Sequence, residues 1–208
     1  MNRFELSNLI NVKDAIGVEL GVAGGSFSVK LIESGKFSNV IGIDSYSTPR
    51  HGIEEYKEAL KRNQFLTSNF KLLKMSFDEA LPLFDDNSID FIYIDGFAHL
   101  GQCGGKTIFD WARKVKMGGV IAGDDYDEKW PLVIDSVNYF IEQNNFDLNL
   151  TDIPPENAPI YSQYRSWYTY KNKEIKGDYS KKIFTKYKSL QLIDYFKNFI
   201  KKLIKNSK

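Results

Sequence analysis

A glycine-rich turn between a short apolar run and a helix-forming segment constrains the fold of this chain more than any other feature. The apolar run covers residues 15–20, and Gly21, Gly24 and Gly25 come directly after it. Glycine adopts backbone conformations that other residues avoid, and it lets a ligand approach the main chain closely. The unpaired N–H groups in the first turn of the next helix can bind an anionic group. The segment therefore predicts a strand, a ligand-binding turn and a helix, in that order.

Strand and helix patterns alternate along most of the remaining chain. The apolar stretches that predict parallel strands lie at 15–20, 39–44, 70–74, 89–94 and 119–123. Two later patterns, at 146–151 and 163–171, predict an antiparallel edge. Between the fourth and fifth parallel strands, a helix is predicted over about 103–115. This alternation is typical of an α/β fold, and we expect a Rossmann-like, doubly wound, mostly parallel sheet of seven strands with helices on both faces. Ligands of such sheets bind beyond the carboxyl ends of the strands.

The spacing of the glycines separates two classes of nucleoside ligand. A dinucleotide site needs the pattern G-x-G-x-x-G, but Ala23 and Ser26 stand where the second and third glycines should follow Gly21. The carboxylate of Glu19 would also repel a pyrophosphate. A ligand with both an ammonium and a carboxylate suits the turn better, and the amino-acid end of S-adenosylmethionine has both. Asp44, at the end of the second predicted strand, can accept hydrogen bonds from both ribose hydroxyls of either nucleoside.

The turn has the pattern E-x-G-x-x-x-G-x-x-S, formed by Glu19, Gly21, Gly25 and Ser28. This pattern resembles the first motif of the class I S-adenosylmethionine-dependent methyltransferases. Ser76 and Phe77, after the third predicted strand, can flank the adenine, and the alternative for this pair is a helix cap and a core aromatic residue. The cofactor-binding residues that we predict are Glu19, Gly21, Gly25, Ser26, Asp44, Ser45, Ser76, Phe77 and Asp95.

Three aspartates follow the fourth and fifth predicted strands, which should be neighbours. Asp95, Asp124 and Asp125 would repel one another in a shared cleft, and a hard cation such as Mg²⁺ or Mn²⁺ would remove that conflict. His99 lies four residues after Asp95, and a neutral imidazole there can accept a proton from a substrate hydroxyl. We therefore predict a metal at the three aspartates, with Asp95 and His99 as catalytic residues. The alternative is that the aspartates cap loops in water and that His99 caps a helix.

Two further stretches carry a more specific resemblance. Ile94-Asp95-Gly96 with His99, and the segment 116–126, resemble the metal-dependent O-methyltransferases that modify sugars on macrolides and similar products. Members commonly have I-D-x-x-H after the fourth strand, and this chain has one more residue between Asp95 and His99. The resemblance covers residues 15–145. It implies metal-assisted O-methylation of a hydroxyl on a sugar, glycan or small natural product.

The composition of the chain leads to expectations about its cellular compartment and its division into domains. Cys103 is the only cysteine and no apolar run approaches the length of a membrane span, so we expect a cytoplasmic protein. The net charge of +1 hides a basic tail, because residues 171–208 contain 12 lysines. We expect a methyltransferase domain over 1–175 and a basic amphipathic helical extension over 176–208. That helix would dock on the body or on a second subunit, or else bind an anionic membrane surface.

Other function classes stay open at this point. The first is an NAD(P)-dependent oxidoreductase on a similar sheet, against which the glycine spacing argues. The second is a nucleic-acid methyltransferase, which the basic tail allows but an acidic cleft disfavours, because the cleft would repel phosphate. The third is a cofactor-binding module without activity. A small-molecule or glycan substrate is expected and a nucleic acid is not.

Overall fold

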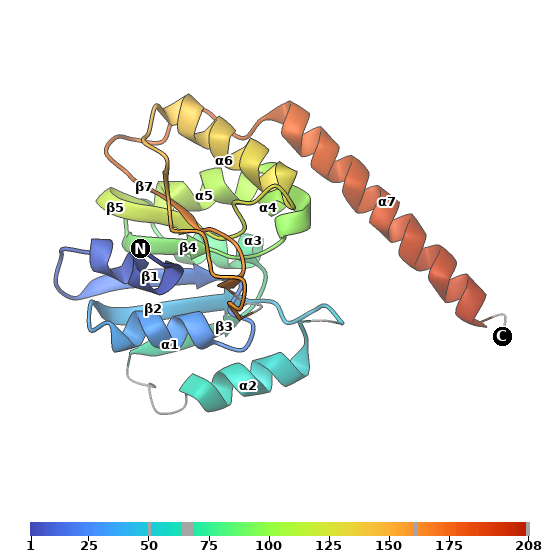
Figure 1. The fold of residues 1–208 in the computed structure, drawn as a ribbon, viewed down its shortest axis with the longest axis horizontal. Helices are drawn as coiled ribbons and strands as arrows, with labels where there is room; N and C mark the ends of the chain where they lie inside the picture. Colours follow the sequence, from blue (N-terminus) through green and yellow to red (C-terminus); the bar gives the residue numbers. More distant parts are fainter. Residues whose placement is uncertain (50, 64–68, 160–161, 207–208) are drawn as a thin grey trace.

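The computed structural model describes residues 1–49, 51–63, 69–159 and 162–206. Its centre is one seven-stranded sheet with the strand order β3-β2-β1-β4-β5-β7-β6 (Figure 1). The strands are β1 (Ala15–Leu20), β2 (Phe37–Asp44), β3 (Phe70–Lys74), β4 (Ile89–Ile94), β5 (Val115–Gly123), β6 (Asn149–Leu150) and β7 (Trp167–Tyr170). The first five strands are parallel to one another, and β7 runs antiparallel to both β5 and β6. The predicted Rossmann-like fold with an antiparallel edge is confirmed.

Helices cover both faces of the sheet (Figure 1). They are η1 (Arg3–Leu9), α1 (Ser26–Glu33), α2 (Ile53–Asn63), α3 (Phe77–Ala80), η3 (Leu81–Leu83), η4 (Ala98–Leu100), α4 (Gly101–Gly104), α5 (Lys106–Lys114), α6 (Pro131–Asn144) and α7 (Lys181–Asn206). Strand β4 shows why two layers form. Its side chains alternate between faces, so that Ile92 and Ile94 join the core under α5 and α6. Phe91 and Tyr93 join the second core, under η1 and α1.

The late strands are shorter than the sequence pattern predicts. β6 contains only Asn149 and Leu150, and β7 pairs with β5 only from Trp167 to Tyr170. Pro154 and Pro155 follow β6, and proline has no N–H to donate to a ladder. The described residues of this connection, 151–159 and 162–166, lie outside the strands. The Tyr126 N–H donates to the Arg165 carbonyl oxygen at 3.0 Å, which holds the end of the connection close to the carboxyl end of β5.

Helix α7 extends away from the rest of the molecule (Figure 1). Tyr187, near its first turns, is buried, whereas Leu192 and Phe196 further along are exposed. None of the described helices combines the length and the apolarity that a membrane crossing requires. The division into a domain over 1–175 and an extension over 176–208 stays a prediction, and residues 207–208 lie outside the described part.

Candidate active site

The carboxyl ends of four neighbouring strands lie level with one another. The Gly21 N–H donates to the Ile43 carbonyl oxygen at 2.9 Å, which joins the ends of β1 and β2. The Asp95 N–H donates to Leu20 at 2.8 Å, which joins β4 to β1. The Asp124 N–H donates to the Ile94 carbonyl oxygen at 3.0 Å, which joins β5 to β4. Residues that follow these strands are therefore held along one edge of the sheet.

The glycine elbow, residues 21–25 between β1 and α1, has little room for side chains. Gly21 has φ of +89°, and a Cβ atom there would lie 1.6 Å from the Asp95 carbonyl oxygen. Gly25 has φ of +80° and precedes the first residue of α1, Ser26. The elbow thus brings the main chain of β1 against that of β4, and it leaves the N–H groups of the first turn of α1 without helical partners. This geometry is what the glycine pattern predicts.

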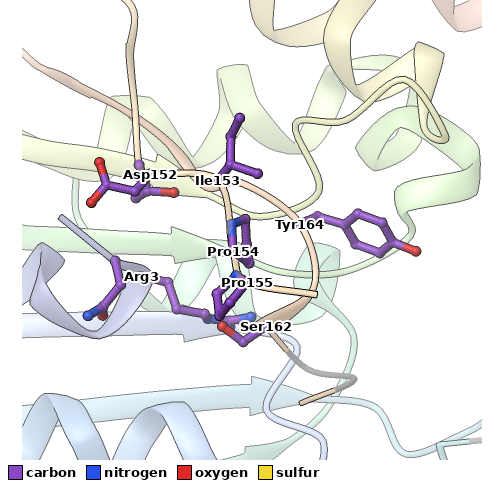
Figure 2. A pocket seen from close by; sticks show the side chains of 9 residues that line it. Arg3, Asp152, Ile153, Pro154, Pro155, Ser162 and Tyr164 are labelled. Carbon is purple, nitrogen blue, oxygen red and sulfur yellow. The ribbon is translucent and has the colours of Figure 1, made fainter. Parts of the chain in front are cut away.

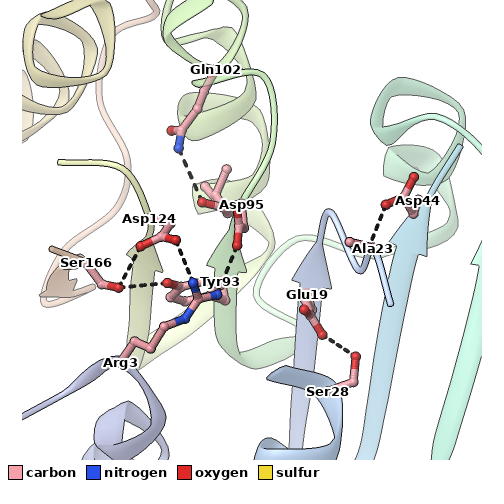
Figure 3. A network of polar contacts seen from close by, with 11 residues as sticks. Arg3, Glu19, Ala23, Ser28, Asp44, Tyr93, Asp95, Gln102, Asp124 and Ser166 are labelled. Atoms are coloured by element: carbon pink, nitrogen blue, oxygen red, sulfur yellow. Dashed lines mark hydrogen bonds and ion pairs between the residues drawn. The ribbon is translucent and has the colours of Figure 1, made fainter. Parts of the chain in front are cut away.

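Glu19 lies beneath the elbow and is almost completely buried, with 1% of its surface exposed. Its carboxylate accepts a hydrogen bond from the Ser28 hydroxyl, so two residues of the predicted motif bind each other (Figure 3). Burial raises the pKa of Glu19 to about 8, although the Ser28 hydrogen bond opposes the shift. A proton or a cationic group nearby would stabilise this site.

Asp44 ties the end of β2 to the elbow. One carboxylate oxygen accepts from the Ala23 N–H at 3.1 Å (Figure 3). The other accepts from the Tyr46 N–H at 2.9 Å. The Tyr46 hydroxyl in turn donates to the Ala23 carbonyl oxygen at 2.9 Å. Each carboxylate oxygen keeps further lone-pair capacity. Asp44 is half-buried and can accept a pair of hydroxyl groups at the rim of the elbow.

The carboxylate cluster, Asp95, Asp124 and Asp125, lies beside the elbow. Each residue offers one oxygen, and the three oxygens lie within 4.8 Å of one another. Asp124 is buried, and the other two are half-buried. Burial raises the pKa of Asp124 and of Asp125, and neighbouring carboxylates raise both further. Strand order thus brings together three acids that the sequence separates by up to 30 positions.

Arg3, which the sequence analysis did not single out, binds two members of this cluster. Its Nη1 donates to Asp124 Oδ2 at 2.6 Å, and its Nη2 donates to Asp95 Oδ2 at 2.9 Å (Figure 3). Ser166 donates its hydroxyl to the other Asp124 oxygen, Oδ1, at 3.1 Å. The contacts of Arg3 span 92 and 121 positions, so no local sequence pattern indicates them. The cluster therefore already contains one cation that belongs to the chain.

Comparisons with known proteins agree with this geometry. Residues 18–126 match a family model described as a methyltransferase domain. This stretch holds the elbow, Asp44 and the whole carboxylate cluster. The chain belongs to the class I S-adenosylmethionine-dependent methyltransferases.

Individual relatives of this methyltransferase are distant. An uncharacterized protein, R132, of Acanthamoeba polyphaga mimivirus is 32% identical over 142 residues, which are 65% of this chain and 63% of the viral protein. An O-methyltransferase from Bacillus cereus in complex with SAH matches the fold with a TM-score of 0.60 at 16% identity, over 81% of this chain and 80% of that one. A putative caffeoyl-CoA O-methyltransferase from Staphylococcus aureus matches with a TM-score of 0.58 at 16% identity, over 80% of each chain.

Other residues predicted to bind the cofactor have mixed positions in this methyltransferase. The Ser76 hydroxyl accepts from the Glu79 N–H at 3.2 Å and thereby caps α3, so the cap alternative describes its contacts. Phe77 packs against Gly96 and meets Phe97 edge-on at 5.6 Å between ring centroids. It therefore lies beside the end of β4, where an adenine could contact it. The Ser45 hydroxyl pairs with that of Ser47, 2.8 Å away.

His99 lies in η4, and its side chain is exposed. It does not belong to the group of closely spaced metal-ligating atoms found among the described residues. The chain beyond it departs from the predicted helix over 103–115, because Gln102 and Cys103 have left-handed backbone conformations with φ of +52° and +58°. Left-handed conformations cost non-glycine residues about 1–2 kcal/mol each, and such strain is often kept at functional sites. The role of His99 as a base stays a prediction.

A cavity of about 280 Å³ opens next to Arg3 (Figure 2). Its lining also includes Asn2, the segment 151–155, Ser162 and Tyr164. Arg3 also contacts Asp95 and Asp124, so one side chain belongs to both the cavity and the carboxylate cluster. Ligand sites commonly occupy such concave positions beyond the strand ends. The cavity is the candidate entrance for a methyl acceptor.

Proposed function

We propose that the protein transfers a methyl group from S-adenosylmethionine to a hydroxyl group of a sugar, glycan or small natural product. The observation that carries this proposal is the contact of the elbow with the end of β4. Gly21 leaves no room for a Cβ beside Asp95, so whatever the elbow binds lies next to the carboxylate cluster. Cofactor and acceptor would then meet at the ends of β1, β4 and β5. The elbow fits a cofactor whose carboxylate binds the N–H groups of α1 and whose ribose hydroxyls bind Asp44.

The reaction places modest demands on this chain. S-adenosylmethionine supplies a methyl group on a sulfonium, and the sulfur keeps the electron pair of the breaking C–S bond. The acceptor oxygen forms the new bond to carbon and loses its proton. The protein must align the oxygen with the methyl group, and proximity of this kind can supply much of the rate. His99 is our candidate for accepting the proton. Asp95, the second predicted catalytic residue, follows the same strand, β4.

A divalent cation, Mg²⁺ or Mn²⁺, fits the donor set in part. The three clustered oxygens are hard ligands at a spacing that one ion can bridge. Asp95, Asp124 and Asp125 would hold the ion, which would lower the pKa of an acceptor hydroxyl bound to it. Arg3 already occupies one oxygen each of Asp95 and Asp124. Metal assistance is therefore part of the proposal and needs its own test.

Ligand-dependent thermal stability tests the cofactor half of the proposal. S-adenosylhomocysteine, at about 100 times its Kd, should stabilise the native protein by roughly 2.7 kcal/mol. That corresponds to a rise in Tm of roughly 5–10 °C for a chain of this size. NAD should produce no rise, and Mn²⁺ or Mg²⁺ should be added to each arm in turn. Stabilisation by NAD with no response to S-adenosylhomocysteine would instead support an oxidoreductase.

Incorporation of labelled methyl groups tests the acceptor half. Sugars and small natural products with free hydroxyls should accept label, and their O-methylated or hydroxyl-free analogues should not. A protein that binds S-adenosylhomocysteine but labels only RNA or DNA would contradict the proposed acceptor class while leaving the cofactor assignment intact.

A further inference from the structure

The chain itself supplies a cation to the carboxylate cluster, in the form of Arg3. We propose that Arg3 is the resident counter-ion of the cluster and that it competes with a divalent cation for Asp95 and Asp124. The inference deepens the proposed function, because it concerns the same site and the requirement of that site for a metal.

The contacts of Arg3 leave little room for a second cation on the same oxygens. Both of its ion pairs use Oδ2 atoms, at 2.9 Å to Asp95 and 2.6 Å to Asp124. The remaining Asp124 oxygen accepts from Ser166. An ion bound to the two Oδ2 atoms would lie against the guanidinium, and like charges at such distances repel strongly in a buried site. Among the described residues, no lysine or arginine forms an ion pair with Asp95 Oδ1 or with the Asp125 carboxylate.

Arg3 is held in place from its other sides as well. Its guanidinium carbon lies 5.0 Å from the ring centroid of Phe27 and 5.0 Å from that of Tyr93. Its side chain is 4% exposed. A planar guanidinium can stack on aromatic rings and bind two carboxylates at once, which a lysine ammonium cannot do as well. The position is therefore a built arginine site and differs from a surface ion pair.

The competition predicts how metal affinity should respond to the charge at position 3. With Arg3 in place, a metal must displace it or bind through fewer oxygens. Without Arg3, the Oδ2 atoms of Asp95 and Asp124 become available as metal ligands. The repulsion between the guanidinium and a divalent ion is also removed. If Arg3 competes with the metal, its removal should make metal binding tighter. If Arg3 only supports the structure of the cluster, its removal should make metal binding weaker.

Mn²⁺ binding to the full chain tests the proposal, measured by the loss of the free Mn²⁺ signal in electron paramagnetic resonance. Arg3→Met should bind Mn²⁺ at least about tenfold tighter than the wild type, as expected for removal of a close like charge. Arg113→Met is the matched control, because Arg113 also pairs with an aspartate, Asp110, but lies at the far end of α5. It should bind Mn²⁺ as the wild type does. Equal or weaker binding by Arg3→Met would overturn the proposal.

Arg3→Lys keeps the proposal testable if Arg3→Met does not fold, which circular dichroism would reveal. A lysine can neutralise one carboxylate well but not both, so Arg3→Lys should bind Mn²⁺ more tightly than the wild type. Affinity unchanged from the wild type would count against competition. Binding of S-adenosylhomocysteine is measured separately without metal. Its absence in the wild type would refute the proposed cofactor and leave the Mn²⁺ comparison valid.

Helix α7 carries a second, independent inference. Leu192, Ile193, Tyr195 and Phe196 are between 46% and 66% exposed, in a stretch that extends away from the body (Figure 1). Exposed lysines accompany them at 181, 182, 186, 188 and 197. The side chains of Asp194 and of residues from 198 onward, where the predicted apolar pattern continues, lie outside the described part. We infer that this helix binds an anionic membrane surface, since apolar side chains flanked by lysines suit both the acyl region and the headgroups.

Co-sedimentation with vesicles tests the membrane inference on the full chain. The protein should pellet with phosphatidylcholine vesicles that contain phosphatidylserine, less so at high salt, and not with phosphatidylcholine alone. Leu192→Ser combined with Phe196→Ser should abolish pelleting. Leu83→Ser is the matched control, because Leu83 is 62% exposed on η3. Concentration-dependent dimerisation that the double variant removes, without vesicle binding, would overturn the inference in favour of a second copy.

Discussion

The site has two halves, the glycine elbow and the carboxylate cluster. The contacts within each half join residues at very different separations in the sequence. In the elbow, Glu19 and Ser28 are nine positions apart, and Asp44 reaches Ala23 over 21 positions. In the cluster, Arg3 reaches Asp95 over 92 positions and Asp124 over 121. The elbow is therefore a local structure that one motif encodes. The electrostatic balance of the cluster exists only once distant segments have packed together.

Substitution of Gly21 should produce the largest effect, because Gly21 belongs to the elbow and lies against the main chain of Asp95. Gly21→Ala places a methyl group on the Asp95 carbonyl oxygen, so binding of S-adenosylhomocysteine should be lost and the free energy of unfolding should fall by well over about 1 kcal/mol. Gly118→Ala is the control, since Gly118 has a similar φ of +82° and nothing within 4 Å of the added atom. It should cost about 1 kcal/mol and keep binding. Calorimetry and urea unfolding measure the two effects.

Removal of one carboxylate from the cluster should produce the second largest fall in the free energy of unfolding. Asp124→Asn removes one of the two ion pairs that Arg3 makes with described residues, and loss of a buried partner costs about 3 kcal/mol. Binding of S-adenosylhomocysteine should change only a few-fold, because Asp124 lies outside the elbow. Glu54→Gln breaks an exposed pair with Lys57 and should cost less than about 1 kcal/mol. If Asp124→Asn abolished cofactor binding as completely as Gly21→Ala, the two halves would not be separable.

The pH dependence of stability should reveal the burial of Glu19. Its pKa is 4.5 in an ordinary environment and about 8 in the folded protein, so the native state binds a proton that the unfolded chain releases. The stability from this group is complete below about pH 4.5 and is lost as the pH rises toward about 8. Glu19→Gln removes this dependence, so its free energy of unfolding should fall less over that range than that of the wild type. Parallel urea-unfolding profiles for the two proteins would contradict the assignment.

Substitution of Ser76 should produce the smallest change in stability. It also tests whether the cofactor site extends beyond the elbow to this residue. Ser76→Ala removes the cap of α3 and should lower the free energy of unfolding by about 1 kcal/mol. Affinity for S-adenosylhomocysteine should stay the same if the hydroxyl only caps the helix. A clear loss of affinity would instead place Ser76 in the adenine site, as the sequence analysis predicted.

Sequence reasoning succeeded where periodicity and chain order decide the outcome. The seven-stranded sheet follows from alternating strand and helix patterns, and the convergence of Asp95, Asp124 and Asp125 follows from the neighbouring positions of β4 and β5. It could not reveal Arg3 or Ser166, because their partners are distant in the chain and neither residue stands in a recognisable pattern.

The start of α5 was misplaced for a different reason. The prediction began this helix at Cys103, but Gly104 and Gly105 have φ of +65° and +87°, and the helix begins at Lys106. The two adjacent glycines are a sequence signal that a helix cannot easily run through this point. The left-handed conformations of Gln102 and Cys103 had no such signal, because they depend on packing: Gln102 is buried and its side-chain amide donates to the Ile94 carbonyl oxygen.

The dependence of the cluster on Arg3 and Ser166 has a consequence for how the protein matures. Arg3 is synthesised well before its partner Asp124 and before Ser166, which also binds Asp124. A nascent chain can form the elbow while its acidic side chains still lack their arginine and hydroxyl partners. Such long-range closure is slow compared with local folding. We therefore expect the carboxylate cluster to gain its arginine and hydroxyl partners only once the chain has been made as far as Ser166, after the elbow can already have formed.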